Sequence, residues 1–600
     1  MNVRAERLKR PVRRPWGGRR RRVSAWHVAL LWALLLAPLL RWGLPDRSRD
    51  ELLFGGGPAW PAERYDAARV LQERRERAAG ADTDLNPLAR RDQLVVLTAD
   101  EPARAEILRR YRLYTRQPDE MITFMALQRM QPRQWDFDPK LYQYGGGFIY
   151  LMAVTVGGAA LVGVTQLSTD VGVYLEQPEL FALFYVVARA VVLLLGAALL
   201  VGVWKLAGRA GGRSAAWLAL LLLACTPVMI TGALEAKPHV PAACLVVWAT
   251  LSALDYHARG RRRDALRMGL QAGYAAGLVL TGIVAAALWP ALVVARRAAG
   301  GRSRPAHRWG RARGLLAAAG LAALVLVITN PYIPLNLMFR RASLASNLDN
   351  SRAMYAGQLA RADVGLVRVA ELLTEGCGLG LLILGLLGLV VLLRARWRET
   401  LIGGAAAVVM AVIGVALGAD KPAEYARFLI LPVSLLCVAG GILLAGIARR
   451  RPVIALVAGG LALLSMPTPA YIRAFGVDAG GWHESRHEAG RYLQAQVGAD
   501  DAVGVLQEPA PFAVPPLDFA RRTVVWLPTV EPAGFEAEDL PRWLVFTADR
   551  EVASGSAWWT RWYELVVRFP RAETRPSPIA WADKTVFVYR RCDGGAGAEN

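Results

Sequence analysis

Two adjacent carboxylates, Asp119 and Glu120, open the most chemically suggestive stretch of this sequence, TRQPDEMITFMALQRMQPRQWDFDPKLYQYGGGFIY (residues 115–150). Pro118 fits the first turn of a helix, where the helix dipole favours acidic side chains, and apolar residues follow at helical spacing. A carboxylate in this place could act as a general base that deprotonates an acceptor hydroxyl or amine. The alternative is that both acids merely decorate the start of a helix.

Cationic side chains that could bind an anion lie in other segments. ADKPAEYAR (419–427) carries Lys421 and Arg427, which could bind a phosphate through charge and bidentate hydrogen bonds, or could snorkel at a membrane surface. EAKPH (235–239) places Lys237 beside Glu235 between two apolar runs, either as a functional charge or as an internal ion pair. Only six lysines occur in the sequence, and Lys140, Lys237 and Lys421 all fall in segments expected outside the membrane. This distribution favours an anionic ligand on that side.

Two further segments place polar groups beside apolar runs. TNPY (329–332) ends such a run, and its Asn330 and Tyr332 either present polar groups at the membrane surface or simply stop a helix. Arg189 lies inside the run YVVARAVVLLLG, where a charge is costly unless it pairs with a loop acid or a lipid phosphate. The set therefore combines a carboxylate pair with dispersed cations and hydrogen-bonding side chains.

The composition identifies the environment in which these residues work. The chain has 600 residues, of which 54% are hydrophobic, and a mean hydropathy of +0.28, values typical of a polytopic membrane protein. Its net charge of +23 could suggest nucleic-acid binding, but the basic residues crowd short loops between apolar runs and the N-terminal 22 residues. That pattern is the positive-inside signature of membrane topology, and we expect no nucleic-acid partner.

The apolar runs predict the organisation of the chain. We expect a basic cytoplasmic tail (1–23), a membrane domain (24–474) and an extracytoplasmic α/β domain (475–600). A first span at 24–44 is followed by a long outer loop (45–147) in which 61–79 and 101–115 read as polar helices. Later runs are near the ~20 residues needed to cross a bilayer: 148–166, 179–204, 214–231, 239–257, 268–295, 314–330, 377–394, 400–418, 426–447 and 453–472.

Basic loops at 296–313, 394–398 and 449–451 assign the late half a clear orientation, with the C-terminal segment outside. Strict alternation fails around 148–178 and across 268–295, the latter readable as two short helices. We therefore expect between eleven and thirteen spans. In the C-terminal domain (475–600), 484–496 reads as a helix, and five short strands are expected at 502–506, 523–526, 543–546, 564–569 and 585–589.

In order along the chain, these motifs resemble those of the GT-C superfamily of membrane glycosyltransferases, in the branch of protein O-mannosyltransferases and aminoarabinose transferases. The matching features are the acid-bearing outer loop (QPDEM), the run DFDPKLYQYGGGFIYL, the arginine-bearing span ARAVVLLLG, the TNPY segment and the late span YARFLILPVSLL. They extend over residues 24–450, most of the predicted membrane part. The acid motif lies further from the first span than is usual in the family, so Asp46, Asp50 and Glu51 are rival acids.

The resemblance implies transfer of a sugar, with inversion, from a polyprenyl-phosphate donor to an envelope lipid, glycan or protein at the outer face of a bacterial inner or plasma membrane. It places catalytic roles on Asp119 with Glu120. Substrate-binding roles fall on residues from several segments: Lys421, Arg427, Lys140, Tyr142, Arg189, Lys237, Asn330 and Tyr332. No cofactor is required by this chemistry, and because the sequence has no dense carboxylate cluster, no metal ligand is assigned and dependence on a divalent metal stays open. The alternative function is a polytopic transporter or lipid flippase.

Overall fold

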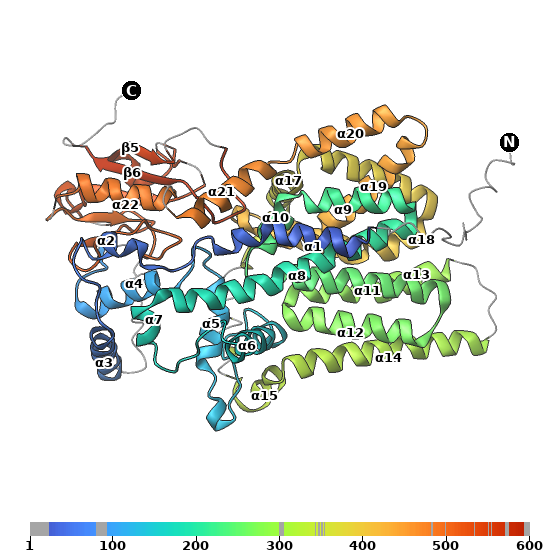
Figure 1. The fold of residues 1–600 in the computed structure, drawn as a ribbon, viewed down its shortest axis with the longest axis horizontal. Coiled ribbons are helices and arrows are strands. Elements are labelled where there is room, and N and C mark those ends of the chain that lie inside the picture. Colours follow the sequence, from blue (N-terminus) through green and yellow to red (C-terminus); the bar gives the residue numbers. More distant parts are fainter. Residues whose placement is uncertain are drawn as a thin grey trace.

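The computed structural model describes residues 23–79, 93–298 and 305–592, apart from short gaps between 342 and 354 and at 482–483, 499, 533, 550, 554 and 571–574. Most of the predicted cytoplasmic tail (1–23) therefore lies outside the described residues. The remainder is a bundle of long apolar helices joined at one end to a smaller region that holds the β-sheet (Figure 1).

The described residues contain seven helical segments long and apolar enough to cross a membrane. They are α8 (Pro178–Gly211), α11 (His239–Arg259), η6 with α13 (Leu280–Ala287, Leu288–Arg297), the end of α14 (Pro305–Thr329), α18 (Leu379–Leu417), η8 with α19 (Ala423–Leu429, Ile430–Ala448) and α20 with α21 (Pro452–Leu464, Thr468–Gly480). The bent pair α9 (Arg213–Ala224) and α10 (Pro227–Ala233) raises the number to eight if counted as one span. The protein is thus a polytopic helical membrane protein, since a helix satisfies its own backbone hydrogen bonds in lipid.

The expected eleven to thirteen spans included shorter apolar segments. Three of these are α1 with η2 (Ala25–Leu36, Ala37–Arg41), α6 (Gly146–Leu161) and α12 (Arg262–Leu278), and each is shorter than 18 residues. The inside–outside alternation of loops predicted from charge fails near 148–178. In Figure 1, α6 is seen nearly end-on while α8 runs along the bundle, so α6 does not lie parallel to the long helices. The run 268–295 is divided between α12 and η6 with α13, as the two-helix interpretation predicts, so that its basic ends lie together.

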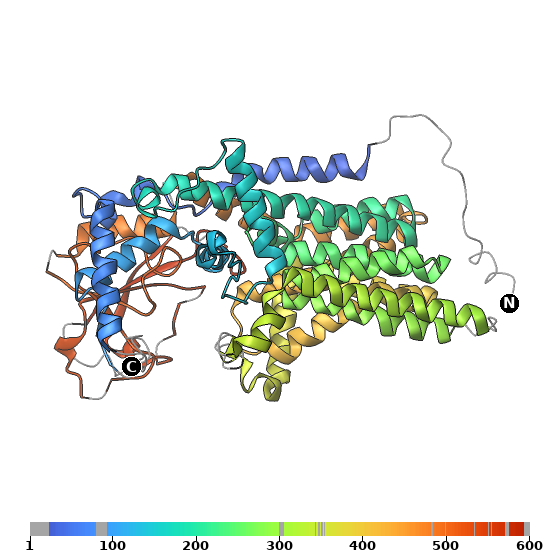
Figure 2. The ribbon, with the colours of Figure 1, turned by 90° about the horizontal axis from the view of Figure 1, so that it is seen from below.

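The bundle is buried unevenly. In their apolar segments, 72% of the residues of α11 and of η8 with α19 are buried, whereas only 11% of those of α14 are. α18 and α9 pack on α19, and α1 packs on α8. Figure 2 places α1 and α14 at opposite edges of the bundle. The central helices are therefore α8, α11 and α19, and the residues at their ends nearest the sheet region meet the first long loop.

The first long loop contains several short elements: η3 (Arg47–Arg49), α2 (Asp50–Leu53), α3 (Ala62–Ala79), β1 (Val95–Val96), α4 (Glu101–Leu113), α5 (Glu120–Arg129) and η5 (Pro132–Gln134). Helices α3 and α4 confirm the two polar helices expected from the sequence. After the loop, α7 (Gly172–Glu176) leads into α8, and α15 (Tyr332–Phe339), η7 (Gln358–Arg361) and α17 (Ala362–Cys377) connect α14 to α18.

The C-terminal region folds as the sequence predicts, with one addition. The expected helix is α22 (Ser485–Gln496), and the five expected strands are β2 (Val503–Val505), β3 (Val524–Trp526), β4 (Trp543–Thr547), β5 (Tyr563–Phe569) and β6 (Val586–Arg591). Short turns η9 (Ala537–Asp539) and η10 (Trp558–Arg561) lie between them. The sheet order is β1-β3-β2-β4-β6-β5, with β2 parallel to both β3 and β4 and the other pairs antiparallel.

The addition is β1, which comes from the first long loop and pairs antiparallel with β3, Val95 opposite Trp526. The hydroxyl of Thr98 also accepts from the backbone N–H of Val524 at 2.9 Å. The loop 45–147 is therefore fastened to the sheet of the C-terminal region, although the sequence pattern separates them by more than 300 residues. The consequence is that the carboxylate pair lies between this region and the helix bundle.

Candidate active site

Three charged residues from distant parts of the chain converge at the end of the bundle nearest the sheet region. The carboxylate oxygen Oδ2 of Asp119 lies 3.0 Å from Lys237 Nζ and 2.8 Å from Arg427 Nη1. Lys237 is buried and Arg427 is 16% exposed in its side chain, while that of Asp119 is 27% exposed. A single oxygen thus receives two cations in a largely dehydrated place, where electrostatic attraction is strong.

Local sequence explains how each member is held. Asp119 is the residue before α5, and its backbone N–H donates to Gln117 Oε1 at 2.9 Å. Lys237 lies in the tight turn between α10 and α11. The residue after it, Pro238, is the N-cap of α11, which begins at His239. Arg427 belongs to the 3₁₀ turn η8 that leads into α19. All three therefore sit at helix ends, where short irregular backbone can aim side chains at one point.

Glu120 differs from its neighbour in its contacts, and its predicted role as a second catalytic acid stays a prediction. Its side chain is fully buried and pairs with Arg189, with distances of 2.8 Å to Nε and 2.7 Å to Nη2. Thr115 Oγ1 donates to it at 2.7 Å and the backbone N–H of Ala236 at 2.7 Å. With both oxygens engaged, Glu120 is positioned to hold the backbone rather than to meet a substrate.

Arg189 is fully buried against the same acid. The substrate-binding role that the sequence suggested for Arg189 stays a prediction. Besides Glu120, its guanidinium donates to the carbonyls of Leu40 at 2.7 Å and Trp42 at 2.6 Å, and it lies 4.6 Å from the centre of the Trp42 ring. The sequence-level alternative, pairing with a loop acid, is the arrangement observed. This buried pair joins α8 to the loop that carries Asp119.

Lys140 and Tyr142 form part of a neighbouring polar cluster. Lys140 Nζ lies 3.2 Å from Asp136 Oδ2, and the Tyr142 hydroxyl donates to Asp138 Oδ1 at 2.6 Å. Asn336 of α15 donates to the other oxygen of Asp138 at 2.8 Å. These contacts of Lys140 and Tyr142 are with Asp136 and Asp138, in a cluster separate from the group formed by Asp119, Lys237 and Arg427.

Asn330 and Tyr332 join chain segments. Asn330 Oδ1 accepts from the backbone N–H of Gly146 at 2.7 Å, and its Nδ2 donates to the carbonyl of Gly277 at 3.2 Å. The Tyr332 hydroxyl accepts from the backbone N–H of Phe137 at 3.0 Å. The ends of α14, α12 and α6 are thereby fixed together, which favours a scaffolding role over the predicted substrate contact for Asn330 and Tyr332.

Lys421 lies near this group but outside it. Its ammonium is 4.7 Å from the centre of the Tyr355 ring and 5.6 Å from that of Tyr425, and the Arg427 guanidinium carbon is 5.2 Å from the same Tyr425 ring. Cations over aromatic faces are held by the ring quadrupole. Lys421 is thus within reach of the region, whereas Lys237 takes the place beside Asp119.

Sequence reasoning missed two contributors, Tyr144 and His239. The Tyr144 ring is buried and lies 6.4 Å from that of His239, which in turn lies 4.8 Å from that of Phe428, the residue after Arg427. Within the described residues, the Tyr144 hydroxyl has no hydrogen-bond partner. Burial raises the pKa of Tyr144 well above its usual value, and the nearby Asp119 carboxylate raises it further. The available sequence signals were that Tyr144 belongs to the run DFDPKLYQYGGGFIYL and that His239 ends the segment EAKPH.

The electrostatics of Asp119 follow from its neighbours. Burial raises its pKa, but Lys237 and Arg427 outweigh this and hold the pKa of the Asp119 carboxyl well below its usual range. Burial also raises the pKa of Glu235, whose Oε2 lies 3.4 Å from Lys237 Nζ. In this arrangement Asp119 is ionised but a weak base, since stabilising the carboxylate reduces its proton affinity.

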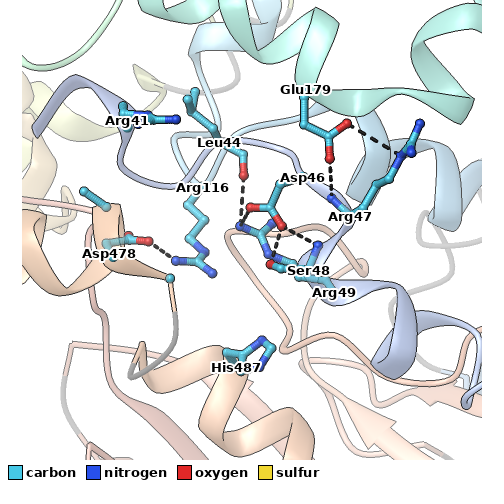
Figure 3. A pocket seen from close by; sticks show the side chains of 13 residues that line it. Arg41, Leu44, Asp46, Arg47, Ser48, Arg49, Arg116, Glu179, Asp478 and His487 are labelled. Carbon is cyan, nitrogen blue, oxygen red and sulfur yellow. Dashed lines mark hydrogen bonds and ion pairs between the residues drawn. The ribbon is translucent and has the colours of Figure 1, made fainter. Parts of the chain in front are cut away.

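The acid segment is also fastened on its other side. Arg116 is buried, with Nη2 at 2.9 Å from Glu484 Oε2 of the C-terminal region and an ion pair from Nη1 to Asp478. Arg116 and Asp478 line a cavity of about 310 Å³ that also includes Asp46, Arg49 and His487 (Figure 3). The rival acid Asp46 accepts a hydrogen bond from the backbone N–H of Ser48, and the rival acid Asp50 forms an ion pair with Arg112 at 3.0 Å. Both acids therefore have partners other than Lys237 and Arg427.

No described residues form a group of three or more histidine, cysteine or acidic side chains able to hold a metal ion. The candidate site consists of Asp119, Lys237 and Arg427, with Tyr144 and His239 around them.

Comparisons with known proteins find distant structural similarities. No protein-family model and no curated protein matches the sequence. The apo structure of ArnT from Cupriavidus metallidurans is similar, with 13% identity and a TM-score of 0.42 over 81% of this chain and 96% of that chain. The structure of the same protein bound to undecaprenyl phosphate has 15% identity and a TM-score of 0.41 over 76% of this chain and 90% of that chain. The oligosaccharyltransferase of Archaeoglobus fulgidus in complex with Zn and sulfate is 14% identical with a TM-score of 0.38, over 60% of this chain.

Both proteins are GT-C glycosyltransferases, the superfamily that the sequence motifs resemble. The match spans about half of the archaeal oligosaccharyltransferase, 51% of its length. The three likenesses have identities of 13–15% and TM-scores of 0.38–0.42.

Proposed function

We propose that this protein is a glycosyltransferase that moves a sugar from a polyprenyl-phosphate donor to an envelope acceptor, a lipid, glycan or protein, with inversion at the anomeric carbon. The observation that carries the proposal is the convergence of Asp119, Lys237 and Arg427 at one end of an apolar helix bundle. A carboxylate beside two cations supplies both halves of a displacement, namely a proton acceptor and a binding place for an anionic leaving group.

Each residue has a defined task in this reaction. The acceptor hydroxyl or amine attacks the anomeric carbon and gives its proton to Asp119, while the bond from that carbon to the phosphate oxygen breaks. The departing phosphate takes the electron pair, and Lys237 and Arg427 stabilise its growing charge more strongly than that of the bound donor. Lys421 lies close enough to contribute at the edge of the same site. Phosphate is a good leaving group, so this scheme requires no cofactor.

The side chains around Arg427 are mostly apolar. Arg427 and His239 line a small cavity of about 20 Å³, whose other walls come mainly from apolar residues of α11, η6, α18 and η8 with α19, including Val246, Met410 and Leu431. A cation beside apolar helix faces suits a lipid-linked phosphate better than a soluble nucleotide sugar, and this supports a polyprenyl phosphate as donor.

The charge pattern supports an outer location for the site. Basic residues lie where α8 ends and α9 begins (Arg209, Arg213), at the kink of α18 (Arg396) and after α19 (Arg449–Arg451), and α8 itself begins near the sheet region (Figure 1). By the positive-inside rule the opposite end of the bundle, where α8 starts, faces outward. The N-terminus is then cytoplasmic, and Asp119 and the C-terminal region are extracytoplasmic.

The deciding experiment uses the full-length protein reconstituted in liposomes with radiolabelled polyprenyl-phosphate sugars and a total envelope lipid and glycan extract. We expect label to move to an acceptor and Asp119→Asn to lower the rate by about 10²–10⁴-fold, the usual contribution of a general base. Movement of intact donor across the bilayer without transfer would instead identify a flippase. Transfer at the wild-type rate by Asp119→Asn would remove Asp119 from the base role.

A further inference from the structure

Lys237, Arg427 and Tyr144 have hydrogen-bonding capacity left over. In the described part of the chain, the buried Arg427 Nε and Tyr144 hydroxyl have no hydrogen-bond partner. Lys237 Nζ carries three N–H groups and faces two carboxylate oxygens, Asp119 Oδ2 at 3.0 Å and Glu235 Oε2 at 3.4 Å. Lys237 and Arg427 both direct an interaction to one oxygen, Asp119 Oδ2. A lone carboxylate oxygen cannot saturate this many donors, whereas a phosphate group has several oxygens with which to do so.

Asp119 is also held differently from the acid beside it. Glu120 is anchored on both oxygens by a buried arginine, a threonine and a backbone N–H, which fixes the first turn of α5. The Asp119 side chain, in contrast, contacts only Lys237 and Arg427 among the interactions described, and it remains 27% exposed. Rotation about its own side-chain bonds would therefore release it from the cations without disturbing the fixed backbone.

The Asp119 carboxylate and a bound phosphate cannot occupy the same place beside Lys237 and Arg427. A phosphate bound to Lys237 and Arg427 would bring its negative oxygens to the place of Asp119 Oδ2, and like charges at contact distance in a buried site repel strongly. The carboxyl of Glu235 already lies 3.4 Å from Lys237 Nζ, which further limits the negative charge that the pair can accept.

We propose that Asp119 occupies the donor phosphate's place in the ligand-free protein, and that the phosphate displaces it from Lys237 and Arg427. This rests on the proposed function and adds an order of events to it. Once displaced, the Asp119 carboxylate no longer has two cations against it, so its proton affinity rises as the donor binds. The base is thus weak in the empty site and becomes effective only when the leaving group is in place.

The chemical step then balances in the displaced arrangement. The acceptor oxygen or nitrogen forms a bond to the anomeric carbon, and its proton goes to Asp119. The bond between the anomeric carbon and the phosphate oxygen breaks, and its electron pair stays on the phosphate facing Lys237, Arg427 and the Tyr144 hydroxyl. In the ligand-free arrangement, the titratable groups around Asp119 are Lys237, Arg427, Glu235, His239, Tyr144 and Tyr425.

The proposal predicts that removing the Asp119 charge tightens phosphate binding. If the displaced arrangement is populated about a tenth of the time, the wild-type affinity lies about tenfold below the intrinsic affinity. Binding of undecaprenyl phosphate to full-length protein in nanodiscs would be titrated for wild type, Asp119→Asn, Lys237→Met and Arg427→Gln. We expect Asp119→Asn to bind about tenfold more tightly and the two cation variants at least about tenfold more weakly.

Glu564→Gln is the control, because it removes a carboxylate from an exposed ion pair with Arg590 at 2.9 Å in the sheet, away from Lys237 and Arg427. Its affinity should equal that of wild type. A second measurement covers altered folding: undecaprenyl phosphate should raise the Tm of Asp119→Asn more than that of wild type, since the variant leaves two buried cations uncompensated.

The outcomes separate this inference from the proposed function. Equal or weaker binding by Asp119→Asn, with weakened cation variants, would show that Asp119 does not occupy the phosphate place. Unchanged binding in the cation variants would overturn the anion site itself. Tighter binding by Asp119→Asn in a wild-type protein that transfers no sugar would support the exchange and contradict the transferase.

Discussion

Two neighbouring acids behave in opposite ways at the residue scale. Asp119 and Glu120 are adjacent and chemically similar, yet one faces two cations at a partly exposed position and the other is sealed into a buried pair with Arg189. The difference comes from their place at the start of α5, where successive residues point about 100° apart. One acid is therefore available for chemistry while the other holds the segment in position.

Breaking the Glu120–Arg189 pair should destabilise the protein strongly. Glu120→Gln leaves the Arg189 charge buried without its partner, at a cost of about 3–5 kcal/mol in the free energy of unfolding. The measurement is the thermal unfolding midpoint in detergent, with Glu564→Gln, which removes an exposed partner of Arg590, as the control. A midpoint as high as that of the control would mean that the pair contributes little to the fold.

At the element scale, the acid segment is clamped between two structures. On one side Arg189 of α8 holds Glu120, and on the other Glu484, at the start of α22, holds Arg116. The hydroxyl of Tyr111 in α4 also donates to the carbonyl of Val514 at 2.7 Å. Because Asp119 lies between these two fixed points, the C-terminal region takes part in aiming it.

We predict that Glu484→Gln lowers kcat more than it alters KM for the donor, because Glu484 acts on Asp119 through Arg116 and does not reach the cation pair. A fall of about tenfold is expected for a small misplacement of the base. Arg116→Met should give a similar loss, and the double variant should lose little more than either single one, since both break the same link. Additive losses would place the two residues in separate roles.

The same ion cluster should make the clamp resist acid. Burial raises the pKa of Glu484, but Arg116 and Arg486 outweigh it and lower that pKa to about 2. A carboxyl with a lowered folded pKa contributes stability that is complete above its unfolded value of about 4.3 and is lost as the pH falls towards about 2. Unfolding midpoints of wild type and Glu484→Gln should therefore differ most above pH 4.3 and converge below it. A difference that persists at pH 2 would contradict the assignment.

At the scale of the whole molecule, the site lies where the helix bundle meets the sheet region (Figure 1). The bundle supplies Lys237 and Arg427 from its helix ends, and the first long loop supplies Asp119. β1 ties that loop into the sheet of the C-terminal region. The candidate site is thus built from three segments of the chain that are distant in sequence.

The proposed orientation can be tested by cysteine labelling. In a variant without native cysteines, Ser556→Cys in the sheet region should react with a membrane-impermeant maleimide in spheroplasts, because this exposed residue is expected outside the membrane. Arg263→Cys, exposed at the opposite end of the bundle near the start of α12, should react only after the membrane is opened. The reverse pattern would invert the topology.

The sequence by itself determined the features that depend on local periodicity. The apolar runs predicted the long helices, the strands of the C-terminal region fell within a few residues of their observed bounds, and the two-helix division of 268–295 was correct. The order of motifs also pointed to Asp119 and to cations including Lys237 and Arg427. These properties can be read along the chain because helix and strand formation are governed by residues a few positions apart.

Tertiary structure alone decided which side chains meet. It joined Lys237 instead of Lys421 to Asp119, buried Glu120 and Arg189 against each other, and added β1 to a distant sheet. It also turned α6 across the bundle, which hydropathy could not show. Such outcomes depend on how helix ends and loops pack in three dimensions, and residues hundreds of positions apart carry no local pattern that records their contact.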